Sequence, residues 1–160
     1  MMDDVAEVPK PVQMLQLLAG FQISQALYAV AELGVATALL TGPRTAEDLA
    51  SSTGANADAL TRVVRALAPL GVFRTEGDLI EVTELGATLA EGTRGSVRDM
   101  ARFWMKTHYG PFGELAHTVR TGETAATRYY GQPFFDWISP QPTLVGLQNH
   151  AMAQCRFACS

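Results

Sequence analysis

The residues best equipped for catalysis or metal binding in this chain are three histidines and two cysteines. None of His108, His117 and His150 is paired in sequence with a nucleophile or a metal-ligand pattern, so we predict no general base among them. Cys155 and Cys159 are two thiolates without a second pair of ligands, which falls short of a zinc site. Their spacing favours the apolar face of a helix instead. We therefore expect no catalytic residue and no metal in this chain.

The strongest candidates for a binding site are apolar and aromatic. They are Phe103, Trp104, Met105, Tyr109 and Met152. Core packing is the simpler explanation for each residue taken alone. As a group they could form an apolar wall for a flat aromatic ligand, because small-molecule pockets are lined mainly by such side chains.

The composition is that of a globular protein and argues against a nucleic-acid partner. Apolar residues make up 48% of the 160 positions and charged residues 18%. With 16 acidic and 12 basic residues, the net charge of −4 supplies no general attraction to a polyanion. Two cysteines placed together near the end of the chain suit a reducing compartment, so we expect a cytoplasmic protein.

The N-terminal part contains the most apolar run. Residues 1–13 are acidic and broken by two prolines, which predicts a flexible segment rather than a secretory signal. Met14–Leu40 follows, and five polar residues interrupt it: Gln16, Gln22, Ser24, Gln25 and Glu32. These interruptions favour one long helix, or two kinked at Gly20, over a membrane span. A helix this apolar must be buried, and a partner chain is its natural cover.

Helix signals follow in quick succession. Thr41–Arg44 is a breaker, and Thr45 then caps a short helix with Asp48 three residues further on. Gly54 ends that helix, and Asn56 caps the next one. The core stripe of this second helix steps by three or four residues: Leu60, Val63, Val64, Leu67 and Leu70.

A hairpin follows the second helix, which Gly71 ends. Val72–Thr75 and Leu79–Val82 are β-prone and joined by a glycine-containing turn. Thr83 then caps another helix. Helix, turn, helix, hairpin, helix is the order of a winged helix-turn-helix. Arg62 and Arg65 on its second helix are most simply a solvated face, with contact to DNA phosphates as the alternative.

The remaining chain is rich in aromatic residues. We predict helices at Val97–Lys106 and Phe112–Thr121, then a loop through Gly131 and Pro133. Pro142 is placed to occupy the first turn of a last helix. The apolar face of that helix is marked by Leu144, Leu147, Ala151, Met152, Cys155 and Cys159.

Five stretches carry a resemblance to a known family, in the family's order along nearly the whole chain. They are residues 26–39 (ALYAVAELGVATAL), 45–73 (TAEDLASSTGANADALTRVVRALAPLGVF), 82–92, 114–125 and 130–152. The sequence resembles the N-terminal dimerisation domain of S-adenosylmethionine-dependent small-molecule O-methyltransferases. These are the plant caffeate and flavonoid type and their actinobacterial relatives of secondary metabolism.

The resemblance implies a mainly α fold, a winged helix-turn-helix-like dimerisation domain with a small β-hairpin wing and extra helices. It implies an intertwined homodimer in which the winged helix does not read DNA. The expected division is a dimerisation helix plus winged helix at 14–95, aromatic acceptor-lid helices and a loop at 96–142, and the start of a linking helix at 143–160. The five apolar site candidates then face a small aromatic acceptor.

The resemblance also implies what this chain lacks. The family's Rossmann-like cofactor domain and its histidine base are expected to be absent, since no glycine-rich loop follows an apolar strand. Gly110 and Gly113 stand in YGPFGE, which follows no such strand. S-adenosylmethionine is thus the cofactor of the complete family enzymes, and we expect no cofactor in this chain.

We therefore predict the dimerising and acceptor-capping part of an O-methyltransferase for a small aromatic or polyketide-like hydroxyl compound, inactive alone. Two alternatives come from other classes. A winged-helix transcription regulator would show duplex binding with a steep salt dependence. A stand-alone binding or dimerisation module would bind aromatic metabolites saturably without the cofactor.

Overall fold

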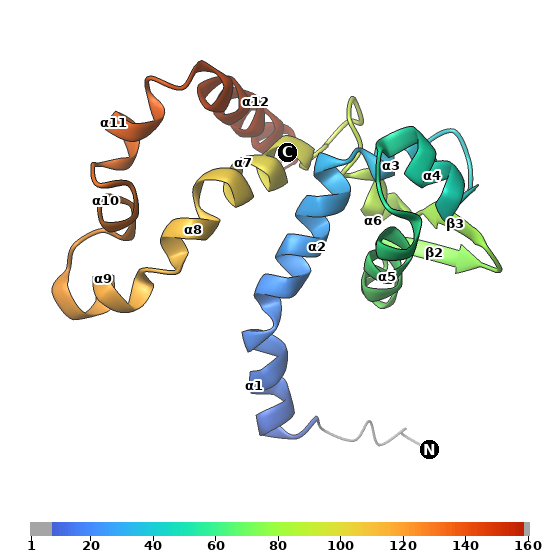
Figure 1. The fold of residues 1–160 in the computed structure, drawn as a ribbon, viewed down its shortest axis with the longest axis horizontal. Coiled ribbons are helices and arrows are strands. Elements are labelled where there is room, and N and C mark those ends of the chain that lie inside the picture. The colour runs from blue at the N-terminus through green and yellow to red at the C-terminus, as the bar shows by residue number, and fades with distance from the viewer. Residues whose placement is uncertain (1–7, 159–160) are drawn as a thin grey trace.

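The computed structural model describes residues 8–158, and its fold is mainly helical with one small sheet (Figure 1). Helices α1 and α2 project as a stalk, with a winged-helix lobe on one side and a lobe of α7 to α12 on the other (Figure 1). The predicted fold class, a mainly α winged helix with a hairpin wing and extra helices, is confirmed.

The apolar N-terminal run forms two helices, α1 (Lys10–Leu18) and α2 (Gly20–Glu32). The break falls at Ala19, next to the kink predicted at Gly20. The first helix begins at Lys10, earlier than the predicted boundary at Met14. Proline in a first turn loses no intrahelical hydrogen bond, so Pro11 is compatible with this earlier start. Of the segment predicted to be flexible, residues 1–7 lie outside the described residues.

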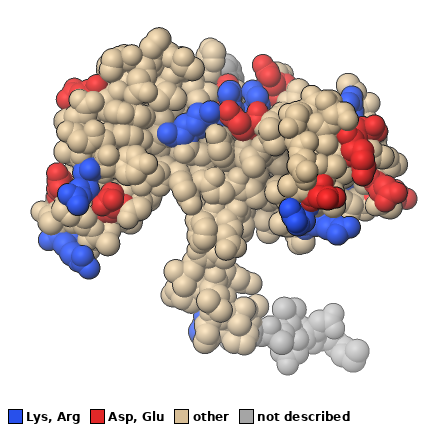
Figure 2. All heavy atoms as spheres, viewed as in Figure 1, with Lys and Arg blue, Asp and Glu red and all other residues tan. Residues whose placement is uncertain are grey.

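The α1 helix is uncovered within this chain. None of its residues is buried, and large apolar side chains of the stalk face outward: Met14 (56% exposed), Leu15 (63%), Leu17 (75%), Leu18 (65%) and Phe21 (54%). By length and composition, Lys10–Glu32 is apolar enough to cross a membrane, with a mean hydropathy of 1.3, although core helices pass the same test. Residues 11–31 contain no charged side chain, and Figure 2 shows the stalk almost bare of charge.

The helix-turn-helix begins with α3 (Val35–Leu39), α4 (Ala46–Thr53) and α5 (Ala57–Leu67). The predicted caps are confirmed. Thr45 Oγ1 accepts the Asp48 N–H at 3.2 Å, and Asn56 Oδ1 accepts the Ala59 N–H at 3.0 Å. Gly54 ends α4 in the left-handed region, at φ +72°.

The stripe predicted on α5 is correct at its centre and wrong at its end. Leu60, Val64 and Leu67 are buried, whereas Leu70 is 44% exposed. The reason is that α5 tightens into a 3₁₀ turn at Ala68–Leu70 before Gly71 ends it, which rotates Leu70 off the buried face. Arg62 and Arg65 are exposed, as predicted for a solvated face.

The wing pairs β2 (Phe73–Glu76) with β3 (Leu79–Val82) in antiparallel register, Phe73 opposite Val82. A third strand, β1 (Arg44–Thr45), pairs with the other edge of β3. Arg44 was predicted to lie in a breaker, and this was wrong because Arg44 pairs with Ile80 of β3. Two residues are too few to show a strand pattern, so only the pairing with β3 reveals β1. The short helix α6 (Glu84–Ala87) follows, capped as predicted by Thr83, whose Oγ1 accepts the Gly86 N–H at 3.0 Å.

The helices beyond the wing are α7 (Arg98–Thr107), α8 (Tyr109–Phe112), α9 (Leu115–Thr121), α10 (Ala125–Tyr130), α11 (Phe134–Ile138) and α12 (Pro142–Ala158). One prediction was wrong: the single helix expected at Phe112–Thr121 is broken at Gly113–Glu114, between α8 and α9. The loop predicted through Gly131 and Pro133 is present at residues 131–133, and the short helices α10 and α11 that flank it were not predicted.

The described residues form two hydrophobic cores. The larger joins α2, α3, α4, α5 and the sheet around residues such as Val35, Leu49, Val64 and Phe73. The smaller joins α7, α11 and α12 through Met100, Phe103, Ile138 and Ala151. Met152 was predicted on the apolar face of α12, but it is 44% exposed. The side chains of Cys155 and Cys159, predicted on the same face, lie outside the described residues.

Candidate functional site

An open groove of about 820 Å³ lies between the stalk and the α7–α8 junction. Its walls are mostly aromatic. One wall comes from α2, with Phe21 and Ser24, and the rest comes from the chain around α7 and α8: Trp104, Met105, His108, Tyr109, Gly110, Phe112 and Gly113. A volume of this size and an apolar lining suit a small flat molecule.

Three of the five predicted site residues lie in this groove. They are Trp104, Met105 and Tyr109. Phe103 does not, because it is 1% exposed and packs in the smaller core with Ile138. Successive side chains of a helix point about 100° apart, so α7 can present Trp104 to the groove only while turning Phe103 toward the core. Met152 lies on α12, outside the groove lining.

Sequence reasoning missed most of the other groove residues. Phe21 and Ser24 are three positions apart and therefore share a face of α2. That spacing was the available signal, but it did not show which distant helix they would meet. Gly110 contributes by being small, because a Cβ there would come within 2.6 Å of the Tyr129 ring. A glycine at this position lets Tyr129 pack directly against α8.

The α7–α8 junction beside the groove is polar and tightly packed. Thr107 is buried, its hydroxyl lies 2.6 Å from the Phe103 carbonyl oxygen, and His108 Nδ1 lies 2.7 Å from the same hydroxyl. The Tyr130 hydroxyl donates to the Thr107 carbonyl at 2.7 Å, and the Tyr130 ring stacks on Trp137 at 3.6 Å. The short helices α10 and α11 thus support the groove from behind.

Burial changes the acid–base behaviour of two of these groups. Desolvation lowers the pKa of His108, which favours the neutral imidazole. Desolvation, with a smaller effect of Tyr129, raises the pKa of the Tyr130 phenol. Both groups are therefore uncharged hydrogen-bonding groups at neutral pH.

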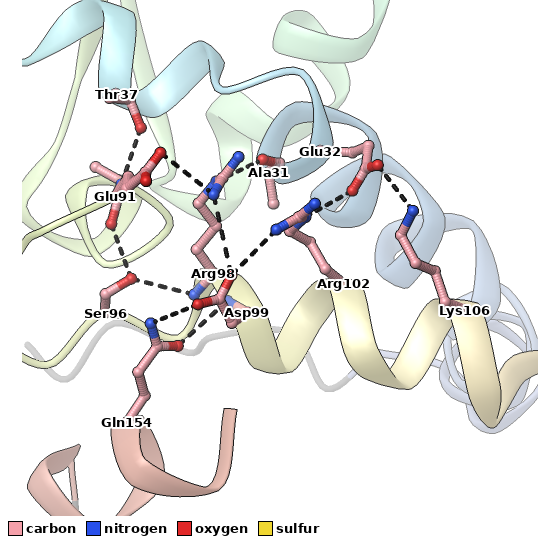
Figure 3. Close-up of polar contacts among 11 residues, drawn as sticks. Ala31, Glu32, Thr37, Glu91, Ser96, Arg98, Asp99, Arg102, Lys106 and Gln154 are labelled. Carbon is pink, nitrogen blue, oxygen red and sulfur yellow. Dashed lines mark hydrogen bonds and ion pairs between the residues drawn. The ribbon is translucent and has the colours of Figure 1, made fainter. Parts of the chain in front are cut away.

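An ion-pair cluster fixes α7 against α2 (Figure 3). Arg102 Nε lies 2.7 Å and Lys106 Nζ 2.8 Å from the two carboxylate oxygens of Glu32. Burial disfavours the ionised form of Glu32, but the hydrogen bonds and charges of Lys106 and Arg102 outweigh it and hold the pKa of Glu32 below its ordinary value. This cluster ties α7 to the last turn of α2.

The same cluster continues to α12 and to the end of α2 (Figure 3). Asp99 accepts from Arg102 at 3.2 Å and from Gln154 at 3.1 Å. Arg98 Nε donates to the Ala31 carbonyl at 2.9 Å, in the last turn of α2. Within the part of the chain that the structure describes, no group of three or more His, Cys, Asp or Glu side chains could hold a metal ion.

Comparison with known proteins identifies the N-terminal part. Residues 15–92 match the model of the O-methyltransferase dimerisation domain. The matched residues include most of the stalk and the whole winged helix, in the order that the structure shows. Residues 15–92 belong to the O-methyltransferase dimerisation-domain family.

Relatives of this dimerisation family extend the similarity beyond residue 92. The chain is 36% identical over 147 residues to the phenazine O-methyltransferase PhzM of Lysobacter antibioticus, covering 91% of this chain and 43% of that protein. It is 35% identical over 142 residues to the 3-amino-4-hydroxybenzoate 4-O-methyltransferase of Streptomyces cremeus, covering 88% and 39%. The chain therefore spans less than half the length of these relatives.

A solved structure gives the same result for the fold. The crystal structure of LaPhzM superposes with a TM-score of 0.88 at 36% identity, covering 92% of this chain and 45% of that one. The groove thus lies where the dimerisation domain, through Phe21 and Ser24, meets the helices after residue 92.

Proposed function

We propose that this chain is the dimerising and acceptor-capping part of an S-adenosylmethionine-dependent O-methyltransferase that acts on a small aromatic or polyketide-like hydroxyl compound. The observation that supports it best is the groove with Phe21, Trp104 and Tyr109 in its walls. Two relatives are named for aromatic compounds, phenazine and 3-amino-4-hydroxybenzoate. Both names specify O-methylation, a reaction that requires a hydroxyl group on the acceptor.

The partner that covers the stalk in this proposal is a second copy of the chain. An exposed apolar surface of this extent marks an interaction site in a soluble protein. The dimerisation domain includes most of the stalk, since its match begins at residue 15. A homodimer with the two stalks packed together would bury side chains such as Leu17 and Leu18 against each other's apolar surface.

The groove does not fit the cofactor. A cofactor site of this class needs backbone amides in a glycine-rich loop and a carboxylate for the ribose hydroxyls. The groove walls are apolar, and no carboxylate lines them. The role of these residues is therefore to orient a flat acceptor and exclude water from it. When bound in a complete enzyme, S-adenosylmethionine supplies the methyl group from its sulfonium.

The charges of the winged helix argue against reading DNA. The hollow of about 540 Å³ between α4, α5 and the wing brings Arg65 together with Glu47 and Asp78. Arg74 on β2 faces Glu81 across the wing. Figure 2 shows both signs of charge mixed on this lobe. A phosphate backbone would meet carboxylates beside each of these cations.

Calorimetric titration of the chain with 1-naphthol tests the proposal. We expect saturable binding, and a loss of affinity of about tenfold in Trp104→Ala, because truncating a central aromatic contact is costly. Phe135→Ala is the matched control, since Phe135 is exposed (68%) and lies outside the groove lining. Its affinity should stay within about twofold of the parent. Equal losses of affinity in Trp104→Ala and Phe135→Ala would show that 1-naphthol does not bind in the groove.

Two further assays separate the alternatives. With radiolabelled S-adenosylmethionine and a hydroxylated acceptor, we expect the 160-residue chain to transfer no methyl group. Methyl transfer would show that the chain contains a complete catalytic centre. With a fluorescent DNA duplex at low salt we expect no binding, and tight binding with a steep salt dependence would favour a transcription regulator.

A further inference from the structure

The imidazole of His108 is the polar group of the groove whose hydrogen-bonding state can be worked out fully. It sits between α7 and α8 and lines the groove beside Trp104, Tyr109 and Phe112. Two aromatic rings hold its plane. Phe103 lies edge-on at 5.3 Å and Phe134 is tilted at the same distance. The ring is therefore fixed in orientation, and its two nitrogens have different surroundings.

The buried hydroxyl of Thr107 decides which nitrogen bears the proton. This hydroxyl has one hydrogen and makes two short contacts, to the Phe103 carbonyl oxygen at 2.6 Å and to His108 Nδ1 at 2.7 Å. The carbonyl can only accept, so the Thr107 hydrogen must point toward it. Two oxygens at this distance without a hydrogen between them would repel each other. His108 Nδ1 must then donate to the Thr107 oxygen.

The other nitrogen is left as an acceptor. In the neutral imidazole, a proton on Nδ1 leaves a lone pair on Nε2. Among the described residues, Nε2 has no hydrogen-bond partner. It is also not among the buried atoms without a partner, so it is accessible to solvent. Burial lowers the pKa of His108, which keeps the ring neutral at neutral pH. An accessible acceptor therefore faces a groove with mostly apolar walls.

The remaining polar side chains of the groove are differently placed. The Ser24 hydroxyl donates to the Gly20 carbonyl at 3.1 Å within α2, so its hydrogen is already used. Tyr109 is 40% exposed, and its hydroxyl can exchange hydrogen bonds with water. Trp104 has an indole N–H, which can only donate. Of these four side chains with nitrogen or oxygen atoms, only His108 combines a fixed ring with an unpaired acceptor.

We propose that His108 Nε2 accepts a hydrogen bond from an O–H or N–H group of an aromatic ligand in the groove, and so selects ligands that have such a donor. This inference rests on the proposed function, because it assumes that the groove binds the acceptor. A ligand without a donor would displace solvent from Nε2 and leave that nitrogen without a hydrogen-bond partner. His108 is thus a specificity-determining residue, and the preferred ligands are phenols and aromatic amines.

Two ligands of nearly the same shape test this. 1-Naphthol has a hydroxyl donor, and 1-methoxynaphthalene carries a methyl ether in its place. By calorimetry, the unchanged chain should bind 1-naphthol roughly fivefold to tenfold more tightly, which is the usual effect of one hydrogen bond. The quantity to follow in each variant is this ratio of affinities, because a general loosening of the groove would weaken both ligands alike.

Two variants of His108 separate its two nitrogens. The side-chain amide of His108→Asn reaches the Nδ1 position and retains a donor toward Thr107, but it places nothing at Nε2. The amide oxygen of His108→Gln reaches the Nε2 position. We expect the ratio to fall to about one in His108→Asn and to stay at roughly threefold or more in His108→Gln. Thermal unfolding of both variants confirms that they are folded before the titrations are compared.

The outcomes distinguish this inference from the proposed function. If both ligands bind the unchanged chain equally well, the role of His108 is wrong and the aromatic groove stands. A ratio in His108→Asn as large as in the unchanged chain would also overturn the role of His108. If neither ligand binds the unchanged chain, the groove is not an aromatic site and both proposals fail.

Discussion

Arg102 Nε and Glu32 Oε2 lie 2.7 Å apart although the two residues are separated by 70 positions in the sequence. This contact joins the last turn of α2 to the middle of α7, and Lys106 binds the second oxygen of the same carboxylate. One carboxylate therefore binds two basic side chains of α7 and links that helix to the stalk, beside the hydrogen bond from Arg98 to the Ala31 carbonyl.

Replacing that carboxylate should change how stability depends on pH. The pKa of Glu32 in the folded chain lies below its ordinary value of 4.5. Ionised Glu32 therefore contributes stability above about pH 4.5, and this contribution is lost as the pH falls through the lowered pKa. The free energy of unfolding of Glu32→Gln should be about 1 kcal/mol lower than that of the parent at pH 7. The difference between the two proteins should be smaller at pH 3. Urea unfolding at fixed protein concentration measures both.

Glu76→Gln is the control for this comparison. Glu76 is an exposed carboxylate on β2, and the structure shows no ion pair for it within residues 8–158. The free energy of unfolding of Glu76→Gln at pH 7 should be within about 0.5 kcal/mol of the parent's. A Glu32→Gln deficit that does not change between pH 7 and pH 3 would mean that the charge of Glu32 is not what joins the two helices.

Gly86 should be the glycine least tolerant of a side chain. A Cβ there would lie 2.0 Å from the Val72 carbonyl oxygen and 2.9 Å from Val82, so backbone would have to move. We expect Gly86→Ala to lower the free energy of unfolding by about 2 kcal/mol or more. Gly146→Ala on α12 is the control, because nothing lies within 4 Å of its Cβ position. That change should be neutral or slightly stabilising, since alanine favours a helix, and a similar loss in both variants would contradict the account.

Gly110 presents a milder case. Its Cβ would meet the end of the Tyr129 ring at 2.6 Å, and Tyr129 is half exposed and free to swing aside. Gly110→Ala should therefore cost less than about 1 kcal/mol. In a Tyr129→Ala background the same substitution should cost nothing. A double-mutant cycle measures this coupling, and an equal cost in both backgrounds would show that Tyr129 does not pack on α8.

Local signals were enough to predict most of the winged helix. The caps at Thr45, Asn56 and Thr83 depend on the capping residue and the next three positions, so the sequence contains all the information. The breaks after residues 54 and 71 are similarly local, because glycine there adopts a left-handed conformation. The strand β1 was missed because only its pairing with β3 defines it.

The groove required information from the tertiary fold. Trp104, Met105 and Tyr109 could be selected by residue type, and they do lie in the lining. Phe103 looked equivalent in sequence, and only the packing of α7 on α12 shows that it faces the core. Phe21 comes from a helix some 80 positions away. The state of His108 depends on Thr107 and on the aromatic rings around it, which no spacing in the sequence expresses.

Substitution on the stalk should break the proposed dimer without unfolding the chain. Leu17 is 75% exposed within one copy, so a glutamate at this position costs the single copy little but would be buried without a partner in the dimer. We expect Leu17→Glu to be folded by circular dichroism and monomeric by light scattering. Val119→Glu on α9 is the matched control, at 80% exposure. It should remain dimeric, and a dimeric Leu17→Glu would place the interface elsewhere.

Sedimentation equilibrium at low micromolar concentration decides whether the exposed stalk pairs two copies of this chain. We expect a mass of about twice the 17.2 kDa of one chain. A folded species of 17.2 kDa at that concentration would rule out the proposed dimer, because the apolar residues of α1 would then face water with no second copy to cover them.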